Sequence, residues 1–193
     1  MKRTCAILIS GAPATGKSTL ATALAPRLGA AVLDLDTATG PLTSLISDLI
    51  GVADLSDPTL AELTRGPRYD TLLGLAEDNL RAGLSVILVA PFTAERSVVG
   101  WRAIANRFSM DDVSPALVWL HLPAHHLVHR LKQRDAARDT NKVQNPDAFL
   151  ATVDHDPPAV EHLALDATRP VEELVDRVLA HVIRPGLAPP GPR

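Results

Sequence analysis

Residues 11–19 form a glycine-rich motif that constrains this chain more than any other feature. They read GAPATGKST and fit the pattern G-x-x-x-x-G-K-[ST]. An apolar run over residues 5–9 precedes the motif, and leucine and alanine recur after it at three- and four-residue spacing until Gly29. This order predicts a buried strand, a glycine turn and a helix over residues 17–28, the setting in which such a loop binds phosphates.

Each part of this loop has a function in nucleotide binding. Its glycines let backbone N–H groups approach phosphate oxygens without an intervening Cβ, and the helix N-terminus adds partial positive charge. Lys17 would bring a full charge to the β- and γ-phosphates, and the Ser18 hydroxyl would ligate Mg²⁺. An ordinary turn between two core elements is the alternative, but it does not explain why Lys17 and Ser18 directly follow the second glycine. The predicted nucleotide-binding residues are Gly11, Ala12, Pro13, Ala14, Thr15, Gly16, Lys17, Ser18 and Thr19.

Apolar runs alternate with amphipathic stretches along nearly the whole chain. Strands are expected over residues 5–10, 31–35, 85–90, 116–122 and 162–165, and further helices over residues 42–50, 69–82, 94–108, 124–137 and 171–183. Continuously apolar strands, as over residues 86–89, are typical of a parallel sheet covered by helices on both faces. The alternation therefore predicts an open α/β sheet whose ligands bind at the carboxyl ends of the strands.

Length and composition limit the classes of protein that remain. The 193 residues suit one domain, and we assign residues 1–184 to it and residues 185–193 to a flexible proline-rich tail. A net charge of −3 and an aromatic content of 3% argue against nucleic acid as a partner. No apolar run is long enough for a signal peptide or a membrane span, so we expect a cytoplasmic protein without membrane contact.

Two carboxylates follow the second predicted strand. Asp34 and Asp36 are two residues apart, so in a strand both would point to the same side. Phosphoryl transfer to a hydroxyl needs one carboxylate to accept a proton or orient the acceptor and another to hold hydrated Mg²⁺. We assign Asp36 as the base and Asp34 as the Mg²⁺-side and acceptor-side carboxylate, although the two could exchange roles. The alternative is that these residues only end a strand and begin a turn.

With these residues in place, the chain resembles the small-molecule kinases of the P-loop nucleoside-kinase-like group. Shikimate kinase, gluconate kinase, chloramphenicol phosphotransferase and zeta-toxin-like proteins belong to that group. The resemblance rests on residues 11–19, on residues 34–36 and on the order of elements. It implies a three-layer α/β P-loop NTPase fold with a five-stranded parallel sheet, a donor site, an acceptor site and a helical lid. The label AAA-family ATPase is also attached to such chains, although no arginine finger of a ring ATPase is visible here.

The resemblance implies that the lid follows the fourth strand, over approximately residues 130–150. Three arginines recur there every four residues, at Arg130, Arg134 and Arg138, and would rise along one side of a helix. We assign Arg134 and Arg138 to the ATP phosphates, with Lys142 as a further candidate and Arg130 as a packed or hinge residue. A solvated face with Arg–Asp pairs that involve Asp135 and Asp139 is the alternative.

Two further arginines are assigned to the acceptor. Arg68 lies between the second and third strands, where the resembled kinases form their acceptor pocket, and Arg96 follows the third strand. A structural role is the alternative for Arg68, and the start of a surface helix is the alternative for Arg96. Ala90 and Pro91 stand where many P-loop proteins carry an acidic residue, which weakens the interpretation as an NTPase switch more than that as a kinase.

The sequence thus predicts an ATP- and Mg²⁺-dependent phosphotransferase that acts on a hydroxyl group of a small molecule, as a monomer or homodimer. A polynucleotide 5′-hydroxyl kinase and a nucleotide-binding regulator that transfers nothing remain as alternatives. The sequence does not identify the acceptor, because acceptor pockets are built from variable loops. The lack of an Asn/Thr-Lys-x-Asp motif favours ATP over GTP.

Overall fold

The computed structural model describes residues 4–52, 57–109, 113–134 and 139–182, except for the side chains of residues 140 and 141. Within them, a five-stranded, all-parallel sheet has the order β2-β3-β1-β4-β5. The strands are β1 (Ala6–Gly11), β2 (Ala30–Asp34), β3 (Ser85–Val89), β4 (Pro115–His121) and β5 (Leu163–Asp166). The helices are α1 (Lys17–Leu28), α2 (Leu35–Leu49), α3 (Pro58–Arg81), α4 (Val98–Ser109), α5 (Ala124–Arg134), α6 (Thr140–Gln144), α7 (Pro146–Thr152) and α8 (Val171–Val182). The predicted α/β fold with a five-stranded parallel sheet is confirmed.

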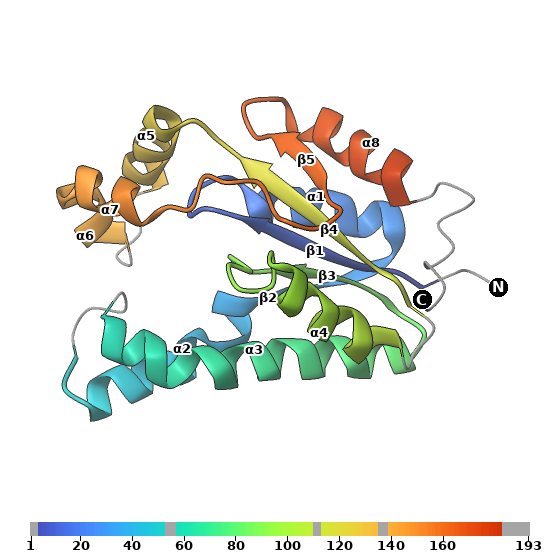
Figure 1. Cartoon of the computed structure of the whole chain (residues 1–193), viewed down its shortest axis with the longest axis horizontal. Helices are drawn as coiled ribbons and strands as arrows, with labels where there is room; N and C mark the ends of the chain where they lie inside the picture. The colour runs from blue at the N-terminus through green and yellow to red at the C-terminus, as the bar shows by residue number, and fades with distance from the viewer. Residues whose placement is uncertain (1–3, 53–56, 110–112, 135–138, 183–193) are drawn as a thin grey trace.

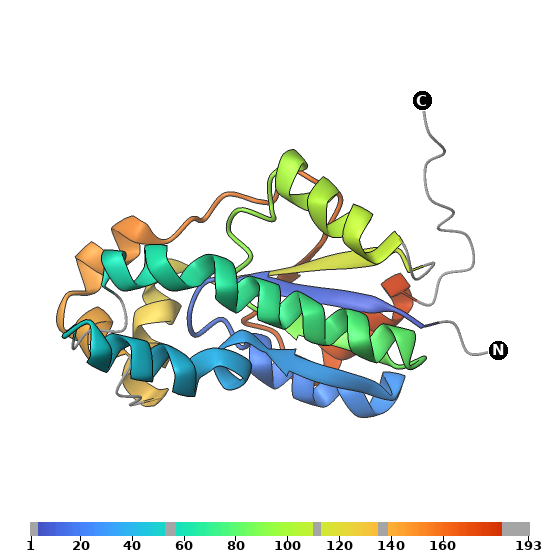
Figure 2. The same cartoon turned by 90° about the horizontal axis from the view of Figure 1, so that it is seen from below.

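Helices cover both faces of the sheet (Figures 1 and 2). Alternate residues of β1 enter two separate apolar cores, as the two-residue period of a strand requires. Ile7 and Ile9 belong to the core that contains residues of α1 and α8, whereas Leu8 belongs to the core that contains residues of α3 and α4. All three of these side chains are fully buried, which explains why consecutive residues of the strand are apolar.

Several helix boundaries differ from those expected from the sequence. Helix α2 begins at Leu35 rather than at residue 42, and α3 begins at Pro58 rather than at residue 69. Each contains an internal glycine–proline pair, Gly40-Pro41 and Gly66-Pro67, which reads in sequence as the end of a helix. Strong N-caps start both helices upstream of these pairs, since Asp34 and Asp57 each accept hydrogen bonds from two backbone N–H groups of the first turn.

The parallel strands direct their carboxyl ends to one edge of the sheet. The glycine loop follows β1 there, α2 follows β2, and the loops after β3, β4 and β5 reach the same edge. Helices α5, α6 and α7 gather beyond this edge, on the left of Figure 1. This edge is where an open α/β sheet binds ligands. No helix in the described part of the chain is long and apolar enough to cross a membrane.

Candidate functional site

The backbone conformation of the glycine loop depends on its two glycines. Gly11 has φ 149° and Gly16 has φ 95°, and Gly16 is also the N-cap of α1. A Cβ on Gly11 would lie 2.5 Å from the Leu120 carbonyl oxygen, so the loop packs directly against β4. Inside the loop, the Thr15 hydroxyl donates a hydrogen bond to the Ala12 carbonyl at 2.9 Å. These contacts hold the loop in one shape at the start of α1, where backbone N–H groups can receive phosphate oxygens.

Lys17 lies over this loop. Its Nζ donates hydrogen bonds to the Gly11 carbonyl at 2.9 Å and to the Ala12 carbonyl at 2.8 Å. The ammonium is therefore held beside the loop interior, close to where a bound phosphate chain would pass. Lys17 also lines the main cavity of the site.

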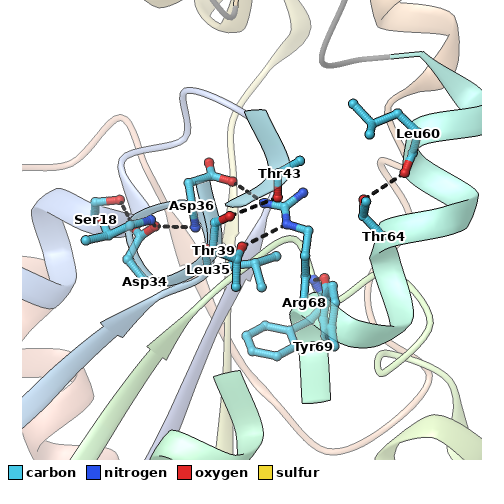
Figure 3. A network of polar contacts seen from close by, with 12 residues as sticks. Ser18, Asp34, Leu35, Asp36, Thr39, Thr43, Leu60, Thr64, Arg68 and Tyr69 are labelled. Carbon is cyan, nitrogen blue, oxygen red and sulfur yellow. Dashed lines mark hydrogen bonds and ion pairs between the residues drawn. The ribbon is translucent and has the colours of Figure 1, made fainter. Parts of the chain in front are cut away.

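Ser18 and Asp34 bring two hard oxygen donors together. The Ser18 hydroxyl donates a hydrogen bond to Asp34 Oδ2 at 2.7 Å, while Asp34 Oδ1 caps α2 by accepting from the backbone N–H groups of Asp36 and Thr37 (Figure 3). Mg²⁺ in kinase sites uses few protein oxygens, together with waters and substrate phosphates. A hydroxyl and a carboxylate this close fit such an ion. No cluster of three or more acidic, cysteine or histidine side chains that could hold a metal occurs among the described residues.

The structure corrects the expected geometry of the two aspartates. They do not alternate along one strand, because β2 ends at Asp34 and Asp36 already lies in the first turn of α2. The strong N-cap at Asp34 ends the strand and begins the helix within one residue. Both carboxylates still line the same cavity.

Arg68, on α3, binds the carboxylate of Asp36. Its Nη2 donates to Asp36 Oδ1 at 2.7 Å and its Nε donates to Thr39 Oγ1 at 2.9 Å (Figure 3). Thr39 in turn donates to the Leu35 carbonyl one turn back. One guanidinium group thus bridges two residues on the same side of α2, and it orients Asp36 in the cavity.

These elements enclose a cavity of about 860 Å³ with a strong excess of positive charge. Its described lining contains two carboxylates, Asp34 and Asp36. It also contains six basic side chains, which are Lys17, Arg68, Arg130, Arg134, Lys142 and Arg169. The whole chain carries a net charge of −3, so this local excess is opposite in sign to the overall charge. A concave surface with such a charge suits a polyphosphate.

The basic residues that the sequence assigned to a lid have different surroundings. Arg134 and Lys142 both donate to Asp139, whose side chain is only 1% exposed. Burial alone would raise the pKa of the Asp139 carboxyl, but the hydrogen bonds from Arg134 and Lys142 lower it below its usual value. Arg138 lies outside the described residues, so its assignment to the phosphates stays a prediction.

Arg130 spans two loops of the site. Its Nη1 donates to the Thr15 carbonyl of the glycine loop at 3.3 Å, and its Nη2 donates to the Ala167 carbonyl after β5 at 2.7 Å. Ala167 lies in a turn in which Asp166 accepts hydrogen bonds from both the backbone N–H and the hydroxyl of Thr168. These hydrogen bonds lower the pKa of the Asp166 carboxyl. The sequence indicated a packed or hinge role for Arg130, but it did not indicate which two segments the side chain joins.

Arg96 is the one predicted acceptor residue that does not line the described cavity. Its side chain is 6% exposed, donates to the Asp156 carbonyl and forms an ion pair with Asp154 at 3.4 Å. It also lies over the Trp119 ring, 5.7 Å from the centroid. These contacts attach the segment before β5 to the loop that leads into α4.

The loop after β3 is held by Tyr69. Phe92 is fully buried with φ 51°, and its N–H donates to the Tyr69 oxygen at 3.0 Å. Burial, reinforced by the charge of Glu95, raises the pKa of Tyr69 to about 12. The hydroxyl therefore stays protonated in the folded protein well above its usual range.

Removing this hydroxyl should destabilise the fold moderately. Tyr69→Phe leaves the buried Phe92 N–H without its acceptor, so we expect the free energy of unfolding to fall by about 1–2 kcal/mol in urea titrations at pH 7. Because the pKa of Tyr69 is raised in the folded state, the hydroxyl contributes fully to the free energy of unfolding below pH ~10. This contribution is lost as the pH rises toward 12. The wild type should therefore lose stability in that alkaline window more steeply than the variant. Equal stability of the two proteins at pH 7 would contradict the assigned hydrogen bond.

Comparisons with known proteins agree with this architecture. A family model described as an AAA domain matches residues 7–154. Three solved structures share the fold. A provisionally assigned kinase from Chloroflexus aurantiacus has a TM-score of 0.65 and 22% identity, and the match covers 94% of this chain and 97% of that one. A gluconokinase from Sinorhizobium meliloti has a TM-score of 0.60 and 17% identity, with 93% and 92% covered. The APS kinase of Mycobacterium tuberculosis, in complex with AMPPNP and APS, has a TM-score of 0.61 and 16% identity, with 93% and 98% covered. No curated protein matches the chain.

Proposed function

Because this chain belongs to the AAA domain family matched over residues 7–154, with the fold of P-loop small-molecule kinases, we propose that it is an ATP-dependent phosphotransferase. The proposed reaction moves the γ-phosphoryl group of ATP to a hydroxyl group of a small molecule. One observation carries the proposal: the phosphate loop and the Asp36 carboxylate line the same cavity. A protein that only binds or hydrolyses ATP has no need for an acceptor-side carboxylate oriented by an arginine.

Each side chain of the cavity has a function in this proposal. Lys17 and the backbone N–H groups of the glycine loop bind the phosphate chain and withdraw charge as the γ-phosphoryl group leaves. Arg134 and Arg138 stabilise the transferring group from the lid. Ser18 and Asp34 would hold Mg²⁺, which would supply positive charge next to the phosphate oxygens.

Asp36 acts on the acceptor side. Its carboxylate accepts a hydrogen bond from the acceptor hydroxyl and orients the oxygen toward the γ-phosphorus. It takes up the hydroxyl proton as the new P–O bond forms and the bond from the γ-phosphorus to the bridging oxygen breaks, which releases ADP. Arg68 keeps the carboxylate in the cavity through the contact at 2.7 Å. We further propose that residues 1–184 act as one domain whose lid spans approximately residues 130–150.

Binding of ATP tests the donor half of this proposal. Lys17→Ala removes the ammonium from the loop, and we expect the dissociation constant for ATP to rise about 100-fold, because charge-assisted hydrogen bonds to phosphate are among the strongest in proteins. Isothermal titration calorimetry measures this directly. Arg27→Ala is the matched control, since Arg27 lies on the same helix, is largely exposed and forms an ion pair with Asp176 far from the loop. If Lys17→Ala bound ATP as tightly as the wild type does, the proposed donor site would be refuted.

Transfer itself is tested with a panel of neutral, anionic and cationic hydroxyl compounds. Sugars, polyols, sugar acids and aminoglycosides are incubated with γ-labelled ATP, and the labelled products are separated. The proposal predicts a labelled acceptor that forms with wild-type enzyme and not with Lys17→Ala. If the protein bound ATP but transferred phosphate to none of these compounds, the result would favour the alternative function, a nucleotide-binding regulator that transfers nothing.

A further inference from the structure

Asp139 is a buried carboxylate that lies behind two basic residues of the cavity. Its Oδ2 accepts hydrogen bonds from Arg134, with the Nε contact at 2.8 Å, and its Oδ1 accepts from Lys142 Nζ at 3.1 Å. Arg134 and Lys142 line the cavity, but Asp139 does not. The carboxylate therefore contacts the two side chains from the side away from the ligand space.

This arrangement joins two separate helices. Arg134 is the last residue of α5, and Lys142 lies on α6. Each carboxylate oxygen contacts a different cation, so the two cationic groups are held next to each other despite their mutual repulsion. Without an anion between them, two like charges on different helices would separate.

We propose that Asp139 is a positioning residue that holds Arg134 and Lys142 side by side against the terminal phosphate of ATP. This inference rests on the proposed function, since it assumes that ATP occupies the cavity. The glycine loop and Lys17 would contact the phosphate chain from one side, and the lid cations line the cavity from α5 and α6. In the proposed function the lid cations stabilise the transferring γ-phosphoryl group, so the terminal phosphate is the one that they would contact.

Two effects of removing the Asp139 charge oppose one another. Loss of a carboxylate makes the cavity more positive, which attracts ATP through a solvent-screened interaction. It also weakens one charged contact of each of two long side chains, whose rotamer freedom must then be lost on binding, and it removes the negative charge that offsets their repulsion. Because the carboxylate is buried and directly hydrogen-bonded to both side chains, we expect the second effect to dominate.

The test is the affinity for ATP relative to that for ADP, measured with fluorescent analogues of both nucleotides. In Asp139→Asn, we expect the dissociation constant for ATP to rise about 10-fold and that for ADP about 2-fold. Asp139→Glu, which keeps the charge, should recover most of the preference for ATP. Asp147→Asn is the matched control, because Asp147 is an exposed carboxylate in the first turn of α7 and does not line the cavity.

A double variant separates positioning from a general effect on folding. If Asp139 acts through Arg134, then Asp139→Asn should change ATP affinity much less in an Arg134→Gln background than in the wild type. Equal weakening of ATP and ADP, unchanged or tighter ATP binding, or full additivity in the double variant would each overturn the inference. If Asp139→Asn does not fold, Arg134→Gln and Asp139→Glu are compared instead. The inference requires Arg134→Gln to lose the preference for ATP and Asp139→Glu to keep it. Failure of the wild type to bind ATP would instead overturn the proposed function.

Discussion

Replacing Asp36 with asparagine is expected to leave ATP affinity unchanged and to lower phosphoryl transfer by about 10²- to 10⁴-fold. Asparagine preserves the shape of the side chain and can still accept the hydrogen bond from Arg68, but it cannot take up the acceptor proton. The structure makes this separation of effects possible, because Asp36 lies on α2 whereas the phosphate loop follows β1. Transfer is measured as the initial rate with the acceptor found in the screen, and ATP affinity by calorimetry.

Asp48→Asn is the control for this variant. Asp48 lies at the other end of α2, is exposed and does not line the cavity, so its substitution should change neither quantity. If Asp36→Asn transfers phosphate at the wild-type rate, Asp36 is not the base. A loss of transfer in Asp34→Asn but not in Asp36→Asn would assign that role to Asp34.

Adding a methyl group at Gly11 should destabilise the whole protein. The Cβ of Gly11→Ala would lie 2.5 Å from the Leu120 carbonyl oxygen and 3.0 Å from the Thr15 hydroxyl, at a residue with φ 149°. A carbonyl of a central strand cannot move aside without disturbing the pairing of β1 with β4. The strained backbone and the clash together should lower the free energy of unfolding by about 3 kcal/mol or more. For a protein of this size, that corresponds to a fall in melting temperature of roughly 6–12 °C.

Gly74→Ala provides the matched glycine control. Gly74 lies inside α3, and nothing is within 4 Å of a Cβ built on it, so alanine should be neutral or raise stability by up to about 1 kcal/mol. Thermal unfolding followed by circular dichroism compares the two variants with the wild type. A Gly11→Ala protein that melts at the wild-type temperature would show that the loop does not pack against β4 as described.

The elements nearest the phosphate loop were predictable because their signals are local. Residues 5–9 are continuously apolar, and the helix after the loop shows its periodicity within a few turns, so β1 and α1 match the expected positions closely. The order of the remaining elements followed from the same alternation. Pairing of β1 with both β3 and β4 could not be read from local pattern, since it depends on how the elements pack.

Helix α2 shows where periodicity misleads. Its leucines mark a helix in the sequence, yet Leu42, Leu45 and Leu49 are 65%, 54% and 77% exposed. The buried side of the helix instead carries Leu35, Thr39, Thr43 and Ser47. Thr39 and Thr43 can be buried because each donates to a carbonyl of its own helix four residues earlier. Hydrophobic pattern alone would have oriented this helix with the wrong face toward the protein.

The candidate site likewise has one part that the sequence predicts and another that only the folded chain shows. Residues 11–19 predict a phosphate-binding loop because all the residues that the motif requires lie within nine consecutive positions. Arg68 and Asp36 are 32 residues apart, and Arg130 and Thr15 are 115 apart, so no sequence spacing relates them. Burial of Asp139 between two cations and the placement of Arg96 outside the described cavity are likewise results of packing. Short-range pattern was enough for the loop and the class of fold, whereas the pairing of each charged group required the folded chain, because electrostatic contacts depend on distance in space.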